Sequence, residues 1–353
     1  MNSLRIATIS KPTPEQWESI ENNCDYATFY QTHMWHNVLC SNPNPYRDNQ
    51  IPEDASQLIR FSDGVEMLLP LVRYKKLKGI FHMYSMSPDN VNSSFLSKDE
   101  ITAEHEQVLV QHLRRYNLSW RQNPFKPLSF YSGFDCEEDN IWVLDMRGGV
   151  EELRKRWQTS HKDFLKHARQ ASNRGVTVGK AETLEQWREF YEVYLESTKR
   201  WDYPKIYSWS VFEAFYNQAS DKVQLWAAWA DGKIIAGQIV FYHSRTVTAW
   251  LKGGLKEYFH LKAPKYLDLQ HLEYYAQEGY WWYDMGSAID PGIAEYKART
   301  GCEKMEGGYL THKNPSLKAY ERVRWESISR LQPLKGRLQK AIPGYKKLIG
   351  VGS

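Results

Sequence analysis

Between Val176 and Thr311 the sequence alternates between strand-like and helix-like segments, and their order limits the possible folds more than any other feature. Apolar and β-branched runs bounded by turn signals predict strands, and longer amphipathic runs predict helices. Asp231-Gly232 is typical of a tight hairpin turn. The predicted strands are 176–181, 223–230, 234–242, 245–251, 280–284 and 304–311, and the predicted helices are 184–199, 210–219, 264–277 and 291–300. This order, β-α-α-β-β-β-α-β-α-β, predicts an α/β fold with a mixed sheet.

The N-terminal part is predicted to form a separate unit. At 353 residues the chain exceeds what one hydrophobic core usually serves, so we expect two domains. Thr13 before Pro14 is typical of a helix start, and Asp63-Gly64 predicts a hairpin. Strands are predicted at 4–9, 57–61, 65–74 and 81–90 and within 128–144, and helices from residue 14, before residue 40 and at 103–116. The predicted organisation is a first domain at 1–148, a second domain at 149–312 and a tail at 313–353.

Cysteine and histidine usage argues against a metal site. The four cysteines, at positions 24, 40, 136 and 302, show no CxxC spacing, and no HExxH motif is present. Such scattered cysteines are compatible with a reducing cytoplasm. The first residues lack the apolar core of a signal peptide, and no apolar run approaches the roughly 20 residues of a membrane-spanning helix. We therefore expect a cytoplasmic protein without a metal.

Basic residues concentrate in two places. The net charge is +4, from 46 Lys and Arg against 42 Asp and Glu. Residues 313–353 hold ten of these basic residues and only two acidic ones, so the rest of the chain is net acidic. The predicted helix ending at Gly175 is also basic, and it is either a solvated face or a phosphate-facing surface. The tail is a basic amphipathic element that could contact anionic lipid or tRNA, or a solvated helix packed on the second domain.

The stretch from Asp284 to Gly301 has the arrangement of a functional loop. It follows the aromatic strand 280–284 and begins with the polar turn 286–288. Pro291 suits the first turn of a helix, and Gly301 suits the position just past its end. Polar loops on a rigid scaffold often carry chemistry, so Lys297 on this short helix is the best candidate for a catalytic group.

Several phrases together resemble the GNAT-like (acyl-CoA N-acyltransferase) domains of Fem-type transferases and their FemAB-like relatives. The phrases in the second domain are Asn173-Arg174-Gly175-Val176, the run WAAWADGKIIAGQ at 226–238, Ala263-Pro264, Tyr283-Asp284-Met285-Gly286-Ser287 and the run GIAEYKARTG at 292–301. Phe29-Tyr30-Gln31, Trp35 and Leu69-Pro70-Leu71 resemble the first domain of such proteins, which is a degenerate copy of the same fold. The resemblance extends to about residue 312 and implies tandem GNAT-like domains, the first degenerate, followed by the basic helical tail.

The resemblance implies transfer of an acyl or aminoacyl group to an amine. Fem-type members use aminoacyl-tRNA and extend peptidoglycan-precursor peptides, and other relatives use acyl-CoA in envelope or exopolysaccharide pathways. GNAT enzymes hold pyrophosphate in an [RQ]xxGx[GA] loop, but the corresponding residues 253–264 do not match it. We therefore expect an N-acyltransferase acting on a cell-envelope, polysaccharide or peptidoglycan precursor. Acyl-CoA or aminoacyl-tRNA would be its co-substrate, with no permanently bound cofactor.

The expected chemistry assigns roles to named residues. Aminolysis of an ester or thioester passes through an oxyanion, which Lys297 could stabilise, as the matching FK or YK lysine of similar enzymes is thought to do. The alternative is a surface lysine paired with Glu295 or Asp290. Asp284 and Asp290 are candidate bases, and a phosphate or carboxylate of the substrate could serve instead. Asp284 is alternatively a structural cap of the turn. The expected donor-binding residues are Gly253, Gly254, Lys262, Ser287 and Arg299, and the expected acceptor-binding residues are Trp35, Tyr84, Ser85, Asp89 and Tyr296.

A second hypothesis is a non-catalytic protein of the same fold. Its basic helix and tail would recognise nucleic acid or an anionic membrane surface, and its binding would weaken steeply with salt. The expected partners are thus an amine-bearing envelope precursor, tRNA, and an anionic membrane contacted through the tail. The last would place a cytoplasmic protein at the inner face of the membrane.

Overall fold

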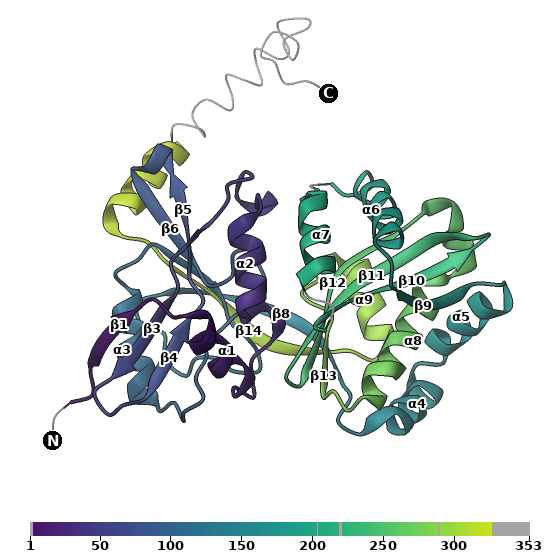
Figure 1. Cartoon of the computed structure of the whole chain (residues 1–353), viewed down its shortest axis with the longest axis horizontal. Coiled ribbons are helices and arrows are strands. Elements are labelled where there is room, and N and C mark those ends of the chain that lie inside the picture. The colour runs from purple at the N-terminus through teal and green to yellow at the C-terminus, as the bar shows by residue number, and fades with distance from the viewer. Residues whose placement is uncertain (1–2, 203, 219–220, 289, 327–353) are drawn as a thin grey trace, which may run out of the picture.

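The computed structural model describes residues 3–202, 204–218, 221–288 and 290–326. They form two lobes that share one long sheet (Figure 1). The sheet has 11 strands in the order β2-β5-β6-β7-β14-β8-β13-β12-β11-β10-β9, and β1, β3 and β4 form a separate 3-stranded sheet. The mixed α/β class predicted from the sequence is confirmed.

The first lobe is formed mainly by residues 3–134. Its strands are β1 (Ile6–Ser10), β2 (Glu53–Asp54), β3 (Gln57–Phe61), β4 (Glu66–Leu69), β5 (Val72–Lys76), β6 (Phe81–Ser85) and β7 (Leu118–Arg121), and its α-helices are α1 (Pro14–Asn22), α2 (His33–Ser41) and α3 (Ala103–Leu113). The predicted strand 65–74 is divided into β4 and β5 because Pro70, between them, has no N–H for a ladder. The predicted strand 81–90 ends at Ser85.

The second lobe contains the element order predicted for residues 176–311. Its helices are α4 (Gly149–Ser160), α5 (Lys162–Asn173), α6 (Leu184–Thr198), α7 (Trp209–Gln218), α8 (Ala263–Gln277) and α9 (Pro291–Arg299). Its strands are β9 (Thr177–Ala181), β10 (Val223–Ala230), β11 (Lys233–His243), β12 (Thr246–Gly254) and β13 (Trp282–Asp284). β12 continues three residues beyond the predicted end, so Gly253 and Gly254 lie in a strand and not in a loop.

Two strands link the lobes. β8 (Asp135–Asp145) pairs with β13 of the second lobe at its end, and with β14 (Glu303–His312) along most of its length. β14 in turn pairs with β7 of the first lobe through Tyr309–His312. The residues near Glu303 therefore lie beside the second lobe, whereas His312 lies in the first (Figure 1).

Alternation along β11 places the second-lobe helices on opposite faces of the sheet. Ile239 and Phe241 pack into a core with α6 and α7, while Val240 between them packs into a core with α8. The first of these cores also takes up Phe29 and Trp35 from the first lobe. Apolar packing therefore joins the two lobes on the α6–α7 side of the sheet.

The described part of the C-terminal tail packs on the first lobe, not on the second as the solvated-helix alternative expected. Residues 315–326 form a helix, in which Leu317 is fully buried and Lys76 of β5 pairs with Glu321. The remaining predicted tail, 327–353, lies outside the described residues. Among the helices of the described chain, none combines the length and the apolar character needed to cross a membrane.

Candidate active site

Two aspartate side chains accept backbone N–H groups in the segment that joins β13 to α9. Asp290 accepts a hydrogen bond from the Ile293 N–H (3.0 Å) at the start of α9, and Pro291 occupies the first turn. Asp284, the last residue of β13, accepts a hydrogen bond from the Gly286 N–H (2.6 Å). Gly286 has a φ of 70°, which glycine adopts without strain. The predicted capping role of Asp284 is thus present in the structure.

Lys297 reaches back from α9 into this turn. Its ammonium donates hydrogen bonds to the carbonyl oxygens of Met285 (2.5 Å), Gly286 (3.0 Å) and Ser287 (2.8 Å). The residue is 9% exposed. An ammonium has three N–H groups, so these carbonyls can use all of them. Lys297 is therefore a buried cation that holds the turn, and not the surface lysine of the alternative interpretation.

Burial shifts the pKa values of Asp284 and Lys297 toward each other. Loss of hydration raises the pKa of Asp284 to about 6, although the Gly286 N–H and the charge of Lys297 oppose the shift. The same loss of hydration lowers the pKa of Lys297 to about 8, against the favourable charge of Asp284. At neutral pH the site thus holds a carboxylate and an ammonium that both titrate close to neutrality.

The site lies where two neighbouring strands separate. β12 and β13 are parallel and pair only at Thr246–Trp282, Val247–Tyr283 and Thr248–Asp284. Beyond Thr248 the ladder between β12 and β13 ends, since Met285 and Gly286 stay hydrogen-bonded to Trp142 of β8 while β12 continues without them. Ligands of open α/β sheets bind where neighbouring strands diverge in this way. The pair Asp284–Lys297 is therefore at a favourable position for a substrate.

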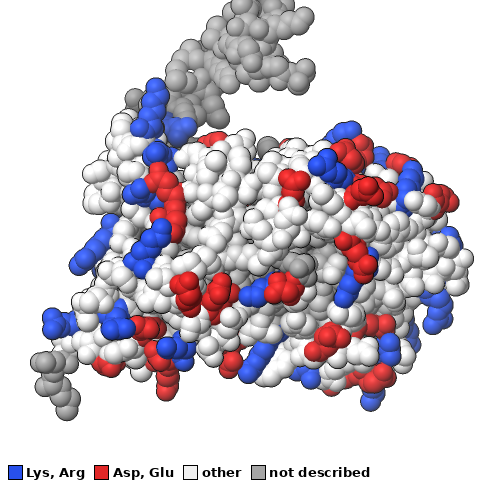
Figure 2. Space-filling model, viewed as in Figure 1, with Lys and Arg blue, Asp and Glu red and all other residues white. Residues whose placement is uncertain are grey.

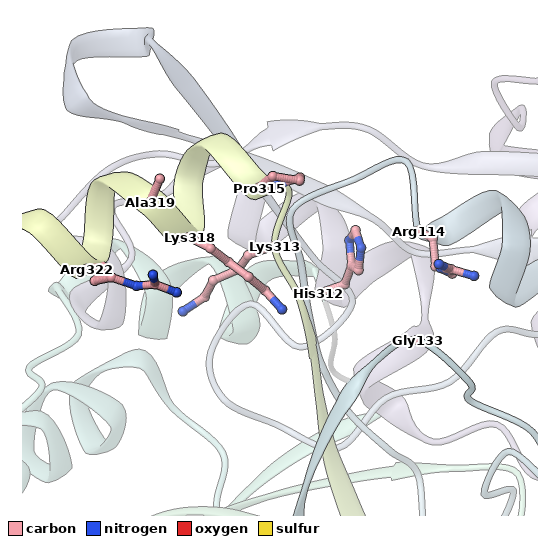
Figure 3. A pocket seen from close by; sticks show the side chains of 8 residues that line it. All are labelled: Arg114, Gly133, His312, Lys313, Pro315, Lys318, Ala319 and Arg322. Atoms are coloured by element: carbon pink, nitrogen blue, oxygen red, sulfur yellow. The ribbon is translucent and has the colours of Figure 1, made fainter.

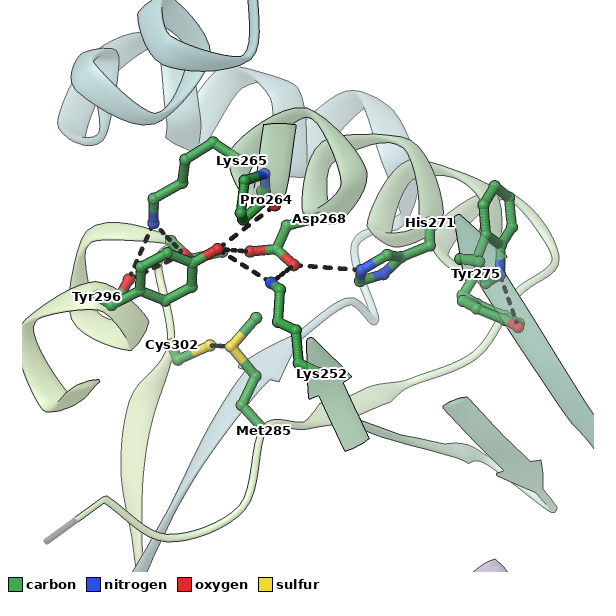
Figure 4. Close-up of polar contacts among 11 residues, drawn as sticks. Lys252, Pro264, Lys265, Asp268, His271, Tyr275, Met285, Tyr296 and Cys302 are labelled. Atoms are coloured by element: carbon green, nitrogen blue, oxygen red, sulfur yellow. Dashed lines mark hydrogen bonds and ion pairs between the residues drawn. The ribbon is translucent and has the colours of Figure 1, made fainter. Parts of the chain in front are cut away.

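A second polar cluster fills the space between β12, α8 and α9 (Figure 4). Asp268 of α8 is fully buried, and its carboxylate binds the ammonium of Lys252, the hydroxyl of Tyr296 and His271 Nε2. The Lys252 ammonium also donates to the Tyr296 hydroxyl (3.0 Å). Lys265 lies against the Tyr296 ring, 3.2 Å from its centroid, and burial lowers its pKa to about 8. This cluster fixes α9, and hence Lys297, against the sheet.

The first lobe contributes polar groups on the other side of Asp284. Asn92 and Arg121 both lower the pKa of Asp284, and Asp284 and Asp89 both raise the pKa of the buried Tyr30 hydroxyl. Asp89 accepts hydrogen bonds from the Tyr207 hydroxyl (2.7 Å) of the second lobe and from the Asn44 amide. Burial raises the pKa of Asp89 to about 7. The structure thus brings Asp89 and Asp284 to the interface between the lobes.

The other acceptor candidates lie apart from the turn. Trp35 is 2% exposed and stacks on Phe215 with ring centroids 5.9 Å apart, so it is part of the core between the lobes and not an open wall. Ser85 is buried and donates to the Ser119 carbonyl (3.2 Å). Tyr84 packs on Tyr116 in the first lobe. Their side chains are occupied by packing within the protein.

Several donor candidates are also engaged elsewhere. Gly253 lies so close to α6 that a Cβ atom would meet Tyr194 Cα at 3.2 Å, and Gly254 exchanges hydrogen bonds with the Ser197 side chain. Arg299 faces solvent and pairs with Glu295 (2.6 Å). The two glycines allow α6 to pack closely on β12, and Arg299 forms a surface ion pair.

Two of the expected donor-binding residues, Lys262 and Ser287, have side chains that are at least partly exposed to solvent. Lys262 is exposed and adopts a left-handed conformation (φ 62°) as the N-terminal cap of α8, where the partial positive charge of the helix favours anions. Its charge lowers the pKa of nearby His167 on the basic helix α5. Ser287 is half-buried, and its carbonyl accepts from Lys297.

The sequence analysis missed the Lys252–Asp268–His271 cluster. A signal was present, because Asp268 and His271 are three residues apart on a helix and so share its face with the buried Leu267, Leu272 and Tyr275. Charged residues on an apolar face need partners, which indicates a buried network. Lys252 gave no local signal, since its partner is 16 residues away. Among the described residues, no group of His, Cys, Asp and Glu side chains is arranged to hold a metal ion.

Comparison with known proteins supports this assignment of fold. Residues 159–298 match the family described as "Acetyltransferase (GNAT) domain". The structure of FemX matches 89% of this chain and 99% of its own, with a TM-score of 0.67 and 10% identity. L-PGS from Bacillus licheniformis matches 88% and 95%, with a TM-score of 0.51 and 13% identity. A C-terminal domain of a putative lysylphosphatidylglycerol synthetase from Agrobacterium fabrum matches 75% and 85%, with a TM-score of 0.52 and 10% identity.

A search of curated protein sequences found no significant match. At such low sequence identities the similar structures show the fold alone. The family match identifies residues 159–298 of the second lobe as similar to a GNAT domain. The turn with Asp284 and Lys297 lies within the matched residues 159–298. Residues 159–298 of this chain are therefore similar to a GNAT acetyltransferase domain, and the chain as a whole shares the two-lobe fold of FemX.

Proposed function

We propose that this protein is an N-acyltransferase that transfers an acyl or aminoacyl group to the amine of a cell-envelope precursor. The observation that carries the proposal is the buried pair of Asp284 and Lys297 on one turn, at the place where β12 and β13 separate. The GNAT family match supports the reaction type. The resemblance of the sequence phrases at 226–238 and 292–301 to Fem-type transferases supports an envelope precursor as the acceptor class.

Asp284 acts as the general base in this proposal. Its pKa of about 6 leaves it mostly ionised at pH 7, yet close enough to neutrality to accept a proton efficiently. The acceptor nitrogen attacks the carbonyl carbon of the donor while Asp284 takes a proton from that nitrogen. The new C–N bond forms first and gives a tetrahedral intermediate. As this intermediate collapses, the bond to the thiol sulfur or the ribose oxygen breaks, and the leaving group receives the proton from Asp284.

Lys297 supplies positive charge beside the reacting carbonyl. The tetrahedral intermediate carries a negative oxygen, which a buried cation stabilises far better than an exposed one. The three carbonyl groups that bind Lys297 fix this cation in advance, so little reorganisation is needed. Lys297 also favours the ionised form of Asp284. The two residues therefore act as one unit.

The donor is proposed to approach between β12 and the start of α8. Lys262 lies on this side, beside His167, and a cation at a helix N-terminus suits the phosphate groups of either acyl-CoA or aminoacyl-tRNA. The glycines of β12 cannot form the phosphate loop of ordinary GNAT enzymes, because their backbone groups bond within the sheet and to Ser197. A donor held mainly through side chains is expected.

Thermal unfolding in the presence of candidate donors tests the donor class. Acetyl-CoA, a long-chain acyl-CoA and a mixture of aminoacyl-tRNAs would be compared at equal concentrations, with uncharged tRNA and free CoA as controls. A ligand at 100 times its Kd stabilises the folded protein by about 2.7 kcal/mol, a shift of several degrees. The donor class that raises the melting temperature is then used in transfer assays with peptidoglycan-precursor peptides as acceptors. No shift and no transfer with any of these donors would contradict the proposal.

A further inference from the structure

We propose that one end of the first lobe docks on a bilayer rich in anionic phospholipid. This end, called the docking end below, consists of residues 75–81, which form the tip of the β5–β6 hairpin, and the helix of residues 315–326. The proposal rests on exposed apolar side chains, unpaired cations and the basic chain that continues from this end. It concerns where the protein binds and does not depend on turnover.

The helix and the hairpin tip are held side by side. Lys76 at the end of β5 pairs with Glu321, and the ring of Phe81 at the start of β6 lies 6.2 Å from that of Tyr320. Lys313 pairs with Glu321 as well (2.8 Å). Both elements therefore lie at the same extremity of the first lobe (Figure 1).

Large apolar side chains are exposed at this extremity. Ile80 at the hairpin tip is 75% exposed, and Val323 and Trp325 in the last helical turns are 62% and 72% exposed. Single exposed apolar residues are normal on a protein surface, but three within one docking end suggest an apolar partner. Trp is favoured at membrane–water interfaces, where its ring meets both apolar chains and polar headgroups.

Cations surround these apolar side chains. Lys78, Arg322 and Arg324 are exposed and form no ion pair with any residue that the structure describes. Figure 2 shows Lys and Arg side chains gathered where the described chain ends. The sequence after Glu326 adds six Lys and Arg and no Asp or Glu. This charge is complementary to anionic lipid headgroups.

A pocket beside the helix can take a headgroup. It has a volume of about 590 Å³ and is lined by the cationic side chains of Arg114, Lys313, Lys318 and Arg322, together with His312 and Gly133 (Figure 3). Lys318 pairs weakly with Asp135 (3.3 Å), whereas Arg114 and Arg322 have no acidic partner among the described residues. Guanidinium groups bind phosphate in a bidentate manner, so the pocket suits a phosphodiester.

The exposed apolar residues of the docking end indicate a membrane, and not a nucleic acid, as its partner. The basic helix α5 carries Lys162, Lys166 and Arg169 along one groove, and none of the exposed large apolar side chains of the described chain lies on it. Phosphate binding alone needs only cations. The docking end combines cations with insertable side chains, as interfacial membrane-binding segments do.

Co-sedimentation with vesicles tests the proposal on the full-length protein. Vesicles of phosphatidylcholine alone would be compared with vesicles containing phosphatidylglycerol, at low and high salt. We expect binding only to the anionic vesicles, weakened by salt. The triple variant Lys78→Glu/Arg322→Glu/Arg324→Glu should bind about 100-fold more weakly. Ile80→Asp should weaken binding by about tenfold, since it removes an inserting side chain.

The matched control reverses three cations in the other lobe: Lys162→Glu/Lys166→Glu/Arg169→Glu. It should bind anionic vesicles as the unaltered protein does. The proposal is overturned if the control loses vesicle binding while the docking-end variant keeps it, or if the protein binds tRNA but no vesicle. Melting temperatures of all variants show whether each is folded. A docking-end variant that unfolds is replaced by the single change Arg324→Glu, whose side chain is exposed.

Discussion

Asp284 and Lys297 bind the same turn through opposite backbone groups, Asp284 through an N–H group and Lys297 through carbonyl groups. The Asp284 carboxylate accepts the Gly286 N–H, and the Lys297 ammonium donates to the carbonyls of Met285, Gly286 and Ser287. The turn thus holds a buried acid and a buried base in a fixed relation without a direct ion pair among the described contacts. Each shifts the other's pKa toward the charged form, although burial outweighs this effect for both.

The pH dependence of transfer should be bell-shaped. The reaction needs Asp284 ionised, so kcat/KM rises as pH increases through about 6. It also needs Lys297 charged, so kcat/KM falls as pH increases through about 8. Rate measurements from pH 5 to 9 check this expectation. In the Asp284→Asn variant, the rise of kcat/KM near pH 6 should be absent from the residual activity. If the rise remained unchanged, a group other than Asp284 would be responsible for it.

Lys297→Met should reduce both activity and stability. It leaves three carbonyls without their donor, which lowers the free energy of unfolding by about 2 kcal/mol. Loss of the cation should lower kcat by about 100-fold. Lys297→Arg keeps the charge and should retain more stability, with the basic limb of the pH profile moved above pH 9. Urea unfolding and initial rates measure the two effects, and Lys304→Met, an exposed lysine on β14, is the control.

Asp89 makes the protein less stable as pH rises. Its pKa is raised from 3.8 to about 7, so the folded state binds a proton more tightly than the unfolded state. The stabilisation is fully present below pH 4 and is lost as pH rises through about 7. Asp89→Asn should therefore be more stable than the unaltered protein at pH 8. Its free energy of unfolding should also change less with pH. Equal stability of the two proteins at pH 8 would contradict this interpretation.

Asp268→Asn should act on catalysis through the position of α9. It weakens the contacts to Lys252 and Tyr296 and leaves the partly exposed Lys252 ammonium without its counter-charge. Breaking a fully buried ion pair costs about 3–5 kcal/mol, and this partly exposed pair should cost less. We expect a lower melting temperature and a lower kcat with little change in KM, since Asp268 does not contact the substrate in our proposal. Asp163→Asn on the exposed side of α5 is the control.

The sequence was most informative where structure is local. Asp231-Gly232, Pro291 and Gly301 marked real turns and caps, and the element order from 176 to 311 matched the structure because each segment follows its own periodicity. Pro70 divides the predicted strand 65–74 into β4 and β5, because a proline has no N–H to donate to a strand ladder. The long strand β8 was recognised only as short pieces, because its residues Asp135–Asn140 are polar.

The site was only partly predictable. Asp284 and Lys297 could be named because one turn and one helix contain both. Burial, which shifts the pKa values of both groups, arises only in the folded protein, and Asn92 and Arg121, which oppose the shift of Asp284, come from the other lobe. No local pattern links residues so far apart in sequence. The surroundings of the expected donor residues Gly253 and Arg299 are likewise set by tertiary contacts: α6 packs on Gly253, and Arg299 pairs with Glu295 on the exposed side of α9.

Single-turnover transfer at pH 7 tests the central claim most directly. It would use the donor class selected by thermal unfolding, with the unaltered protein, Asp284→Asn, Lys297→Met and the exposed control Arg299→Ala. The account predicts rates about 100-fold lower for the first two variants and within about threefold of the unaltered protein for Arg299→Ala. Folded Asp284→Asn and Lys297→Met proteins that both transfer at the unaltered rate would contradict it.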